Sequence, residues 1–437
     1  MEWYLTLIAI IGGLLVLMLT GLPIAFAFVI INVIGIYLWF GGEIGLRQLI
    51  VSFSSGLTTF TLLAVPLFIL MGDVMLYSGL SPKMIDALDK WLGRLPGRLG
   101  LLSVVAGTVF ATFTGASMAS VAMLGSTLVP EMEKRGYKKS MSLGPILGSS
   151  GLAIMIPPTS LGVLLGAVAE ISIGALLIAI IMPGLLLAAL YATYIILRCH
   201  LQPDIAPPYP VSPSPMLEKL AATSKYILPL GFIVFLVVGS MFLGIATPEE
   251  TAAAGALGTF ILSAFYKRLD WGMVKKSFSG TVSISVMVFL IVMGAISFSQ
   301  ILAFSGASTG LVKLATSLAV APILVFIAMQ FIVVIMGMFM AATAIIMIVM
   351  PLFMPVVHAL GINEIWFAVV TMINIEMALI SPPFGMCCFV MKAVAPPDTT
   401  MGDCYRAALP FCYLDLIGMA LIMVFPVIAL WLPGVMR

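Results

Sequence analysis

Residues 314–363 read LATSLAVAPILVFIAMQFIVVIMGMFMAATAIIMIVMPLFMPVVHALGIN, and these 50 positions contain no Asp, Glu, Lys or Arg. A helix that crosses a bilayer needs about 20 consecutive apolar residues, so this stretch can hold two helices and a turn. Residues 171–197 and 277–312 are also free of charged side chains, and we expect one span in the first run and one or two in the second. The sequence therefore predicts an all-α polytopic membrane protein.

The composition supports the same class. Only 9% of the 437 residues are charged and 62% are hydrophobic, whereas soluble domains carry about 25% charged residues. A soluble fold of this length could not bury so much apolar surface. A transmembrane β-barrel is excluded because it would show alternating segments of about 10 residues. We therefore expect the chain to lie in the lipid bilayer of the bacterial inner membrane, as a multi-pass protein.

The sequence offers no sign of a nucleic-acid partner or of catalysis. The net charge is only +2, and no basic stripe interleaved with aromatic residues is present. No phosphate-binding G-x-x-x-x-G-K-[ST] motif occurs, and neither His lies near a nucleophile or a metal-spaced partner. The five cysteines form no C-x-x-C pair. We expect a protein that is not an enzyme.

One polar connector divides the chain. Residues 199–225 contain six prolines between Pro203 and Pro215, and such density favours an extended, solvated segment. The predicted domains are a first repeat over 1–198, this connector, and a second repeat over 226–437. Apart from two regions rich in small residues and proline, 99–169 and 320–394, we predict spans near 4–20, 23–40, 57–78, 171–197, 226–246, 251–266, 281–304 and 411–432.

The two halves match each other at a fixed offset of 225 residues. Proline and glycine dictate backbone shape, so they can persist while other side chains change. The coinciding positions are Pro23 with Pro248, Pro130 with Pro355, Gly136 with Gly361, and Pro157-Pro158 with Pro382-Pro383.

The charges of equivalent loops then predict orientation. Residues 131–139 contain four basic side chains, whereas their counterparts at 356–364 contain no Lys or Arg. Because basic loops stay in the cytoplasm, equivalent loops should face opposite sides of the membrane. The sequence therefore predicts two inverted-topology repeats, which are typical of secondary transporters.

Each half contains one segment that predicts a re-entrant hairpin. In the first half, Thr112–Ser120 (TFTGASMAS) lies between two apolar stretches too short to span, which favours a hairpin over about 99–136 with this motif at its tip. In the second half, Gly337–Thr343 (GMFMAAT) is the corresponding tip of a hairpin over about 320–361. A second interpretation of the first motif is close helix packing through small residues.

Each half also contains a predicted discontinuous helix. In the first half, Gly148-Ser149-Ser150-Gly151 leads into Ile156-Pro157-Pro158-Thr159, which should break a helix over about 140–169. In the second half, Ser381-Pro382-Pro383 should break a helix over about 365–394. The freed carbonyls are suitable ligands for a hard cation such as Na⁺, although a simple kink is the alternative.

Three acidic residues are candidates for a role inside the membrane, where carboxylates are costly. Glu376 precedes the second break by six residues and is the best charged candidate, with a structural ion pair or a capping role as the alternative. Asp73 and Glu170 are weaker candidates, because Asp73 could simply end a span.

At these residues the chain resembles the large membrane subunit of tripartite ATP-independent periplasmic (TRAP) transporters. The resemblance covers essentially the full length. The stretches that carry it are VPLFILMG (65–72), TGASMASVA (114–122), LVPEMEKRGY (128–137), IPPTS (156–160), ATPEETAAAG (246–255), SPPFG (381–385) and the tail pattern from Val424-Phe425-Pro426 through Trp431-Leu432-Pro433.

The resemblance implies an elevator-type transporter that takes up a small organic acid together with Na⁺. It implies two partners, a small four-helix membrane subunit and a periplasmic substrate-binding protein. Two Na⁺ sites are implied, one at Thr114, Gly115, Ser117, Gly151 and Pro157, and the other at Gly337, Thr343, Ser381 and Pro382. The implied substrate contacts are Thr114, Ser117, Ser120, Thr159, Thr343 and Glu376.

The chain departs from the family pattern at both tips. The second tip often carries an acidic residue near position 341, where this chain has Met340-Ala341, and the first has Ala116 where many members have Ser. Two other classes stay open from the residues alone. One is a stand-alone symporter or exchanger of Na⁺ and an organic anion that needs no binding protein, and the other is a channel or membrane scaffold.

Overall fold

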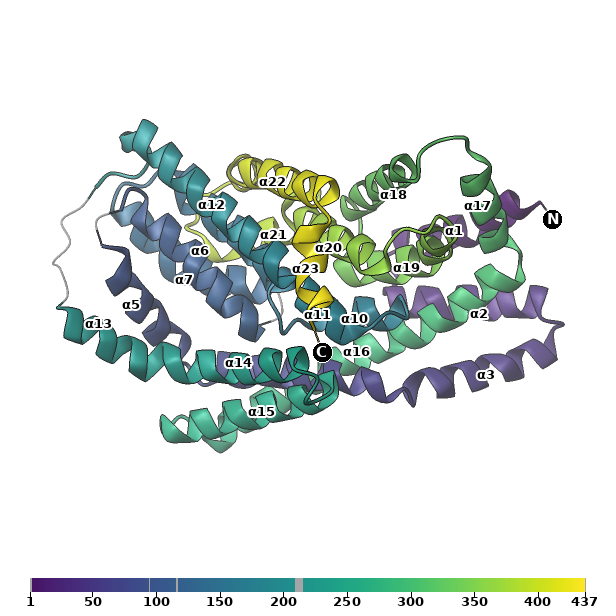
Figure 1. The fold of residues 1–437 in the computed structure, drawn as a ribbon, viewed down its shortest axis with the longest axis horizontal. Helices are drawn as coiled ribbons and strands as arrows, with labels where there is room; N and C mark the ends of the chain where they lie inside the picture. The colour runs from purple at the N-terminus through teal and green to yellow at the C-terminus, as the bar shows by residue number, and fades with distance from the viewer. Residues whose placement is uncertain (1, 94, 115–116, 209–214, 437) are drawn as a thin grey trace.

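The computed structural model describes the backbone of residues 2–93, 95–114, 117–208 and 215–436, and the side chains in these ranges except those of 81 and 111–114. Every regular element in these ranges is a helix, which confirms the all-helical prediction (Figure 1). The first half contains α1 (Trp3–Leu19), α2 (Ile24–Trp39), α3 (Glu43–Leu57), η1 (Phe60–Leu63), α4 (Ala64–Tyr77), α5 (Ser81–Leu92), α6 (Arg98–Thr114), α7 (Ser117–Lys134), α8 (Lys139–Ser142), α9 (Gly144–Met155), α10 (Ser160–Val168), α11 (Ile173–Ala179) and α12 (Ile181–Leu201).

The connector and the second half contain the remaining helices. They are η2 (Pro203–Ile205), α13 (Met216–Ala222), η3 (Thr223–Ile227), α14 (Leu228–Phe242), α15 (Pro248–Phe265), α16 (Trp271–Phe304), α17 (Ala307–Ser317), α18 (Pro322–Gly337), α19 (Ala342–Ala359), α20 (Glu364–Ile380), α21 (Met386–Val394), α22 (Met401–Val424) and α23 (Val427–Gly434).

Six helical segments in the described residues are long and apolar enough to cross a membrane, and a bent pair, Lys139–Met155 with Ser160–Val168, makes a seventh. The polytopic prediction is therefore confirmed. The six are Phe60–Tyr77, Ile173–Leu201, Met216–Phe242, Trp271–Phe304, Ala342–Ala359 and Met401–Val424.

One predicted span differs in the structure, and the run 277–312 holds one span of the one or two expected. The span expected over 411–432 is interrupted, because α22 ends at Val424 and Pro426 precedes α23. Proline disfavours helical geometry in the residue before it, and Phe425 indeed leaves the helix with φ −120° and ψ 76°. The run 277–312 holds one long helix, α16, which ends before Gly306 in the left-handed conformation at φ 76°.

The helices form two groups, which also contact each other through α16 with α19 and α4 with α6. α16 packs against α2, α3 and α4, while α15 packs against α4 and α14. Figure 1 shows α14, α15 and α3 along one edge of the molecule and α12, α22 and α18 along the opposite edge. Buried Asn32 ties α2 to α16 by donating to the carbonyl oxygen of Gly294 at 2.7 Å. We call the group of α2–α4 and α14–α16 the scaffold group, and the group of α6, α7, α9, α10 and α18–α22 the hairpin group.

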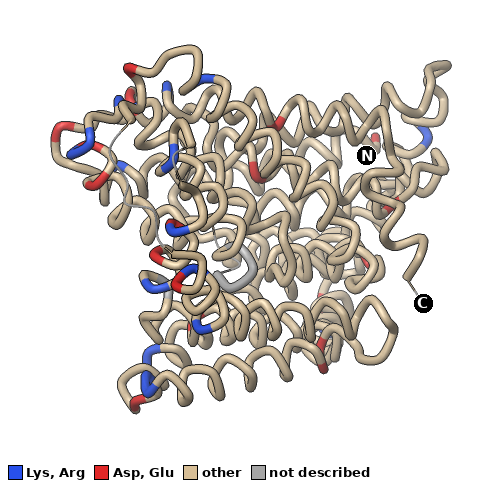
Figure 2. The backbone as a smooth tube through the Cα atoms, turned by 60° about the vertical axis from the view of Figure 1, so that its left-hand side comes forward, with Lys and Arg blue, Asp and Glu red and all other residues tan. Residues whose placement is uncertain are grey.

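Most basic side chains gather toward one end of the molecule (Figure 2). Contacts between loops that are distant in sequence hold this end together. These contacts are Lys138 N to the Ile205 carbonyl at 2.9 Å, the Lys90–Glu218 ion pair, the Tyr266 hydroxyl to the Lys225 carbonyl, and the Lys139–Asp398 ion pair at 2.7 Å. The basic loop at 131–139, which the positive-inside rule assigns to the cytoplasm, takes part in these contacts through Lys138 and Lys139.

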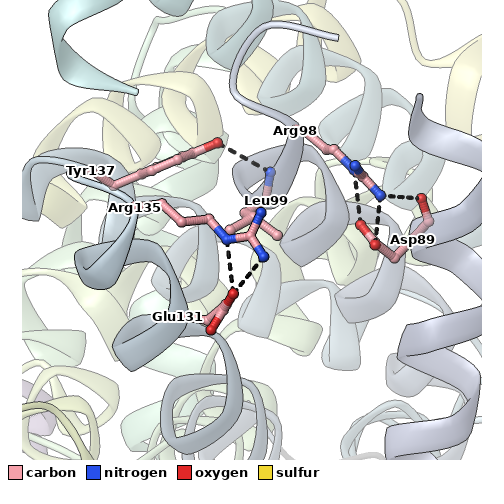
Figure 3. Close-up of polar contacts among 6 residues, drawn as sticks. All are labelled: Asp89, Arg98, Leu99, Glu131, Arg135 and Tyr137. Carbon is pink, nitrogen blue, oxygen red and sulfur yellow. Dashed lines mark hydrogen bonds and ion pairs between the residues drawn. The ribbon is translucent and has the colours of Figure 1, made fainter. Parts of the chain in front are cut away.

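Arg98, the first residue of α6, fixes the base of the first helix pair (Figure 3). Its Nε and Nη2 donate to the two carboxylate oxygens of Asp89 at 3.0 and 2.6 Å, and Nη2 also donates to the Asp89 carbonyl at 3.0 Å. Burial raises the pKa of the Asp89 carboxyl more than the neighbouring Arg98 charge lowers it. Nearby, Arg135 pairs with Glu131, and Tyr137 accepts a bond from Leu99 N at 3.5 Å.

Candidate cation and substrate site

The first tip lies between two helices of opposite direction. α6 ends at Thr114 and α7 begins at Ser117. Gly115 and the side chain of Thr114, both predicted ligands, lie outside the described residues. Ser117 is 4% exposed and its hydroxyl has no hydrogen-bond partner, while Ser120, one turn later, is fully buried. A buried hydroxyl without a partner at a helix end is a suitable oxygen ligand for a cation.

The first tip and the first break lie at a similar level. α6 and α9 run side by side in the same direction: a Cβ on Gly100 would contact Pro145 at 3.3 Å, and one on Gly107 would lie 2.7 Å from Ser149. Gly107 precedes the end of α6 by seven residues, and Ser149 precedes the end of α9 by six. The sequence segments that were predicted to act together are therefore neighbours in space.

The first break itself supplies another unpartnered hydroxyl. α9 and α10 meet at an angle of 48°, and residues 156–159 between them include Pro157 and Thr159. Thr159 is fully buried, and its Oγ1 has no hydrogen-bond partner. The end of α9 presents carbonyls with partial negative charge, so the break combines two features that a cation requires.

The second tip has a different chemistry. α18 ends at Gly337, α19 begins at Ala342, and Thr343 is half-buried in its first turn. A Cβ on Gly337 would lie 2.3 Å from the Ala378 Cβ, so the absence of a side chain lets α18 approach α20. Phe339 at the tip is 63% exposed, and its ring lies 6.3 Å from that of Phe384 in the second break.

The second break offers fewer free oxygens. Residues 381–385 separate α20 from α21, and Pro382 is half-buried. The Ser381 hydroxyl donates to the Ala378 carbonyl at 3.3 Å, which leaves only its lone pairs for a cation. Among the described side chains of the second tip and the second break, no buried hydroxyl lacks a partner. The residues therefore fit a cation better at the first tip than at the second.

The two halves cross-pack around these breaks. α10, which follows the first break, packs against α19 of the second helix pair, and α21, which follows the second break, packs against α7 of the first. At the second contact, a Cβ on Gly125 of α7 would lie 2.8 Å from Val394 of α21. Each broken helix therefore contacts both helix pairs.

Polar side chains also join α18 to α20. Asn374 donates to the backbone carbonyl of Gln330 at 2.8 Å, and the Gln330 amide donates to Thr371 at 2.9 Å. All three residues are buried, and the Asn374 Oδ1 has no partner.

Glu376 and Gly151, which were predicted separately, are direct neighbours. Glu376 is fully buried, and a Cβ on Gly151 would lie 2.1–2.4 Å from its side-chain atoms. Gly151 lies one turn inside α9, so its missing side chain provides room for the glutamate. Two further partners, Tyr191 and Asp415, were missed by the sequence reasoning. The lone carboxylate of Asp415 inside an apolar helix was the signal that could have revealed it.

Asp73 lies on α4 of the scaffold group. It accepts a hydrogen bond from the Thr281 hydroxyl at 3.2 Å, and a Cβ on Gly280 would lie 2.7 Å from its carboxylate. Asp73 therefore links α4 to α16. Glu170 adopts a left-handed conformation, with φ 57°, in the turn between α10 and α11. It lines a cavity of about 280 Å³ with Thr59 and Thr61 of the scaffold side.

Comparison with known proteins identifies similar sequences of full length. A family model described as "Tripartite ATP-independent periplasmic transporter, DctM component" matches residues 11–428. The C4-dicarboxylate TRAP transporter large permease protein of Pseudomonas aeruginosa is 29% identical over 86% of this chain and 86% of its own. The ectoine TRAP transporter large permease protein of Halomonas elongata is 29% identical over 95% of this chain and 96% of its own.

Two solved structures share the fold. The YdaH transporter of Alcanivorax borkumensis has a TM-score of 0.61 at 15% sequence identity, covering 87% of this chain and 88% of that one. MtrF of Neisseria gonorrhoeae has a TM-score of 0.60 at 16% identity, covering 88% and 85%. At such low identity these similarities concern the fold alone.

Proposed function

The chain belongs to the family of DctM components of tripartite ATP-independent periplasmic (TRAP) transporters, and we propose that it is the large membrane subunit of a sodium-coupled importer of small organic acids. As a member of this family it is an inner-membrane permease and not an enzyme. The proposed partners are a small four-helix membrane subunit and a periplasmic binding protein that delivers the substrate. The relatives named for C4-dicarboxylates and ectoine support a small, carboxylate-bearing substrate.

The observation that carries sodium coupling is the pair of buried, unpartnered hydroxyls of Ser117 and Thr159. Ser117 begins α7 after the first tip, and Thr159 precedes α10 after the first break. Each therefore follows a helix, α6 or α9, whose C-terminal carbonyls carry the partial negative charge that favours a cation. Na⁺ prefers oxygen ligands, and a bound ion would satisfy both hydroxyls. The proposed first site therefore comprises Thr114, Gly115, Ser117 and Thr159 with carbonyls near Pro157. Gly151 is left out of this site because the Glu376 side chain packs directly against it.

The proposed second site comprises Gly337, Thr343 and Ser381 with carbonyls near Pro382. It depends more on backbone oxygens, because the second tip is apolar and the Ser381 hydroxyl is already engaged. The proposed substrate contacts lie next to the two tips, at Thr114, Ser117, Ser120, Thr159 and Thr343. Glu376 has no exposed surface, so its predicted contact with substrate would require the helices to separate.

We propose an elevator movement of the hairpin group against the scaffold group. The cross-packing of α10 with α19 and of α21 with α7 supports a body that moves as one unit. Cavities between the two groups, such as the one lined by Thr59 and Glu170, mark surfaces where they are not fully packed together.

The test is uptake of a radiolabelled dicarboxylate into proteoliposomes that contain both membrane subunits, with the binding protein added outside. An inward Na⁺ gradient should drive accumulation. Uptake that ignores an imposed Na⁺ gradient would refute sodium coupling. Equal uptake without the binding protein would instead support the stand-alone symporter.

Two variants localise the proposed first site. Ser117→Ala and Thr159→Ala should each raise the half-saturating Na⁺ concentration by about tenfold, which corresponds to about 1.4 kcal/mol for one lost ligand. Thr127→Ala is the matched control, because Thr127 is exposed on α7 and its hydroxyl bonds to the Met123 carbonyl. An unchanged Na⁺ requirement in both site variants would remove these residues from the site.

A further inference from the structure

Three fully buried side chains from distant helices meet between the broken helices and α22. The Tyr191 hydroxyl of α12 lies 3.2 Å from Glu376 Oε1 of α20 and is also hydrogen-bonded to Asp415 Oδ1 of α22. All three residues have no exposed surface. The second oxygen of each carboxyl, Glu376 Oε2 and Asp415 Oδ2, has no hydrogen-bond partner.

No basic side chain among the described residues forms an ion pair with either carboxyl. On α12, Arg198 lies two turns from Tyr191 and sits 5.9 Å from the ring of Tyr194. On α21, Lys392 is engaged by the carbonyls of Pro397 and Thr399. The charge of the two carboxyls is therefore not balanced by a protein cation.

The other surrounding helices supply no compensating charge among the described residues. α18 contains no titratable side chain, while Arg98 of α6, Lys139 of α8 and His358 of α19 pair with Asp89, Asp398 and Glu364. α9 contributes Ser150 and Gly151, α21 contributes the fully buried Cys387, and α22 adds Cys412 one turn before Asp415. α11 and α23 contain no titratable side chain. Two ionised carboxylates buried together without a counter-charge would cost several kcal/mol each.

Counting the protons leads to the same conclusion. A tyrosine hydroxyl has one proton to donate, whereas an ionised carboxylate can only accept. If both carboxyls were ionised, Tyr191 could satisfy only one of its two contacts, and the two free oxygens would repel each other. One additional monovalent cation offsets the second negative charge. A proton also lets a carboxyl donate to Tyr191, whereas a sodium ion would bind at a free carboxylate oxygen.

We propose that Glu376, Asp415 and Tyr191 form a buried site for one monovalent cation, held either as a proton on one carboxyl or as a sodium ion at the unpartnered carboxylate oxygens. The site is separate from the tips proposed above for Na⁺ and does not depend on them. Glu376 of α20 packs against Gly151 of α9. The site therefore joins both broken helices to α12, which carries Tyr191, and α22, which carries Asp415. Its occupancy is therefore sensitive to how these four helices pack.

The experiment measures the thermal unfolding midpoint of the full-length protein in detergent. The wild type is compared with Glu376→Gln, Asp415→Asn and the double variant, over a range of pH and of NaCl concentration with choline as the replacement. Glu364→Gln is the matched control, because it makes the same change on the same helix α20 at a solvent-accessible carboxyl paired with His358.

At high pH without Na⁺, each neutralised variant should unfold at a midpoint at least about 2 °C above the wild type, since it no longer buries two negative charges. Lowering the pH, adding Na⁺, or both should raise the wild-type midpoint and close this gap. Glu364→Gln should respond like the wild type. Na⁺ binding at the tips would raise the unfolding midpoints of the wild type and of every variant alike. It therefore does not change the difference between the midpoints of a variant and the wild type.

The same measurements distinguish a bound proton from a bound sodium ion. If the cation is a proton, the gap closes with falling pH at any salt concentration. If it is sodium, the gap closes with NaCl at fixed pH and not with choline chloride. A gap that is absent under all conditions, or that neither treatment changes, would overturn the proposal.

A second measurement avoids dependence on variants that fail to fold. Infrared difference spectra of the wild-type protein, recorded on adding Na⁺ or base, should show a protonated carboxyl band that disappears if the site holds a proton. Tyr191→Phe keeps both carboxyls and removes the bridging hydroxyl, so this change should shift the same response to a different pH or Na⁺ concentration. A wild type with no carboxyl band, whose midpoint responds to Na⁺ no more than that of Glu376→Gln, would refute the site.

Discussion

Single glycines decide how closely the helices of the hairpin group approach one another. Gly151 accommodates Glu376, and Gly337 accommodates Ala378, in both cases at distances that no Cβ tolerates. These glycines lie inside helices or at a helix end, where glycine is otherwise unfavourable by about 1 kcal/mol relative to alanine. Their presence is explained by tertiary contact, because the backbone at these positions requires no left-handed conformation.

Gly337→Ala should lower the free energy of unfolding by about 1–3 kcal/mol, because the new methyl group would force α18 away from α20. Thermal or denaturant unfolding in detergent measures the effect. Gly231→Ala is the control, since a Cβ there meets nothing within 4 Å and alanine favours helix α14. Equal stability of the two variants would show that the close approach of α18 and α20 is not required.

Gly151→Ala should be destabilising by a similar amount, about 1–3 kcal/mol, because its methyl group would overlap the Glu376 side chain. Glu376→Ala shortens that side chain, so the double variant should recover part of the loss. A double-mutant cycle on the unfolding free energies gives the coupling. Additive effects of the two changes would contradict the contact.

At the scale of elements, the helix ends differ in whether side chains cap their free backbone groups. α15 begins with a capping box in which Thr247 and Glu250 exchange hydrogen bonds, and α22 begins with an equivalent box of Thr400 and Asp403. In contrast, the ends of α9 and the start of α10 lack side-chain caps. The end of α9 lies at the break, where a cation would find its free carbonyls.

Arg98 holds two elements together, and its geometry is specific to arginine. Arg98→Lys would retain the charge but lose the fork that binds both Asp89 oxygens, so we expect a loss of about 1–3 kcal/mol. The comparable change Arg135→Lys, in a pair that is one-third exposed, should cost less than about 1 kcal/mol. Unfolding midpoints compare the two, and a larger effect at Arg135 would contradict this ranking.

At the scale of the whole molecule, the charge distribution gives the orientation. The basic loops gather at one end (Figure 2), and the second-half loop at 356–364 has no Lys or Arg. We therefore predict that this end faces the cytoplasm, which would place equivalent loops of the two halves on opposite sides. The inverted relation of the halves stays a prediction until this orientation is measured.

Cysteine labelling in intact cells measures the orientation of the protein in the membrane. The five native cysteines are buried and should give little background. Lys275→Cys, at the exposed start of α16, should react with a membrane-impermeant maleimide only after the cells are opened. Ala359→Cys, at the exposed end of α19, should react in intact cells. Labelling of both positions from the same side would refute the inverted topology.

The sequence determined the class of the protein and the places where its helices break. Uncharged runs of more than 20 residues can only be buried in lipid or in other helices, and paired prolines cannot continue a helix. The positions of both tips and both breaks follow from such local rules. The helices α3, α5, α13 and α17 were not predicted, because each contains charged residues and the prediction relied on uncharged apolar runs. α13 lies in the connector, so the extended conformation expected over 199–225 was wrong there.

Only the tertiary structure decided which faces of these helices meet. Tyr191 lies 185 residues from Glu376 and 224 from Asp415, and nothing in their local sequence pairs them. In a helix that is apolar on every side, the pattern of side chains does not indicate which face is turned inward. Three features could therefore be identified only from the assembled helices. They are the buried carboxyl pair, the packing of Glu376 against Gly151, and the cross-packing of the breaks.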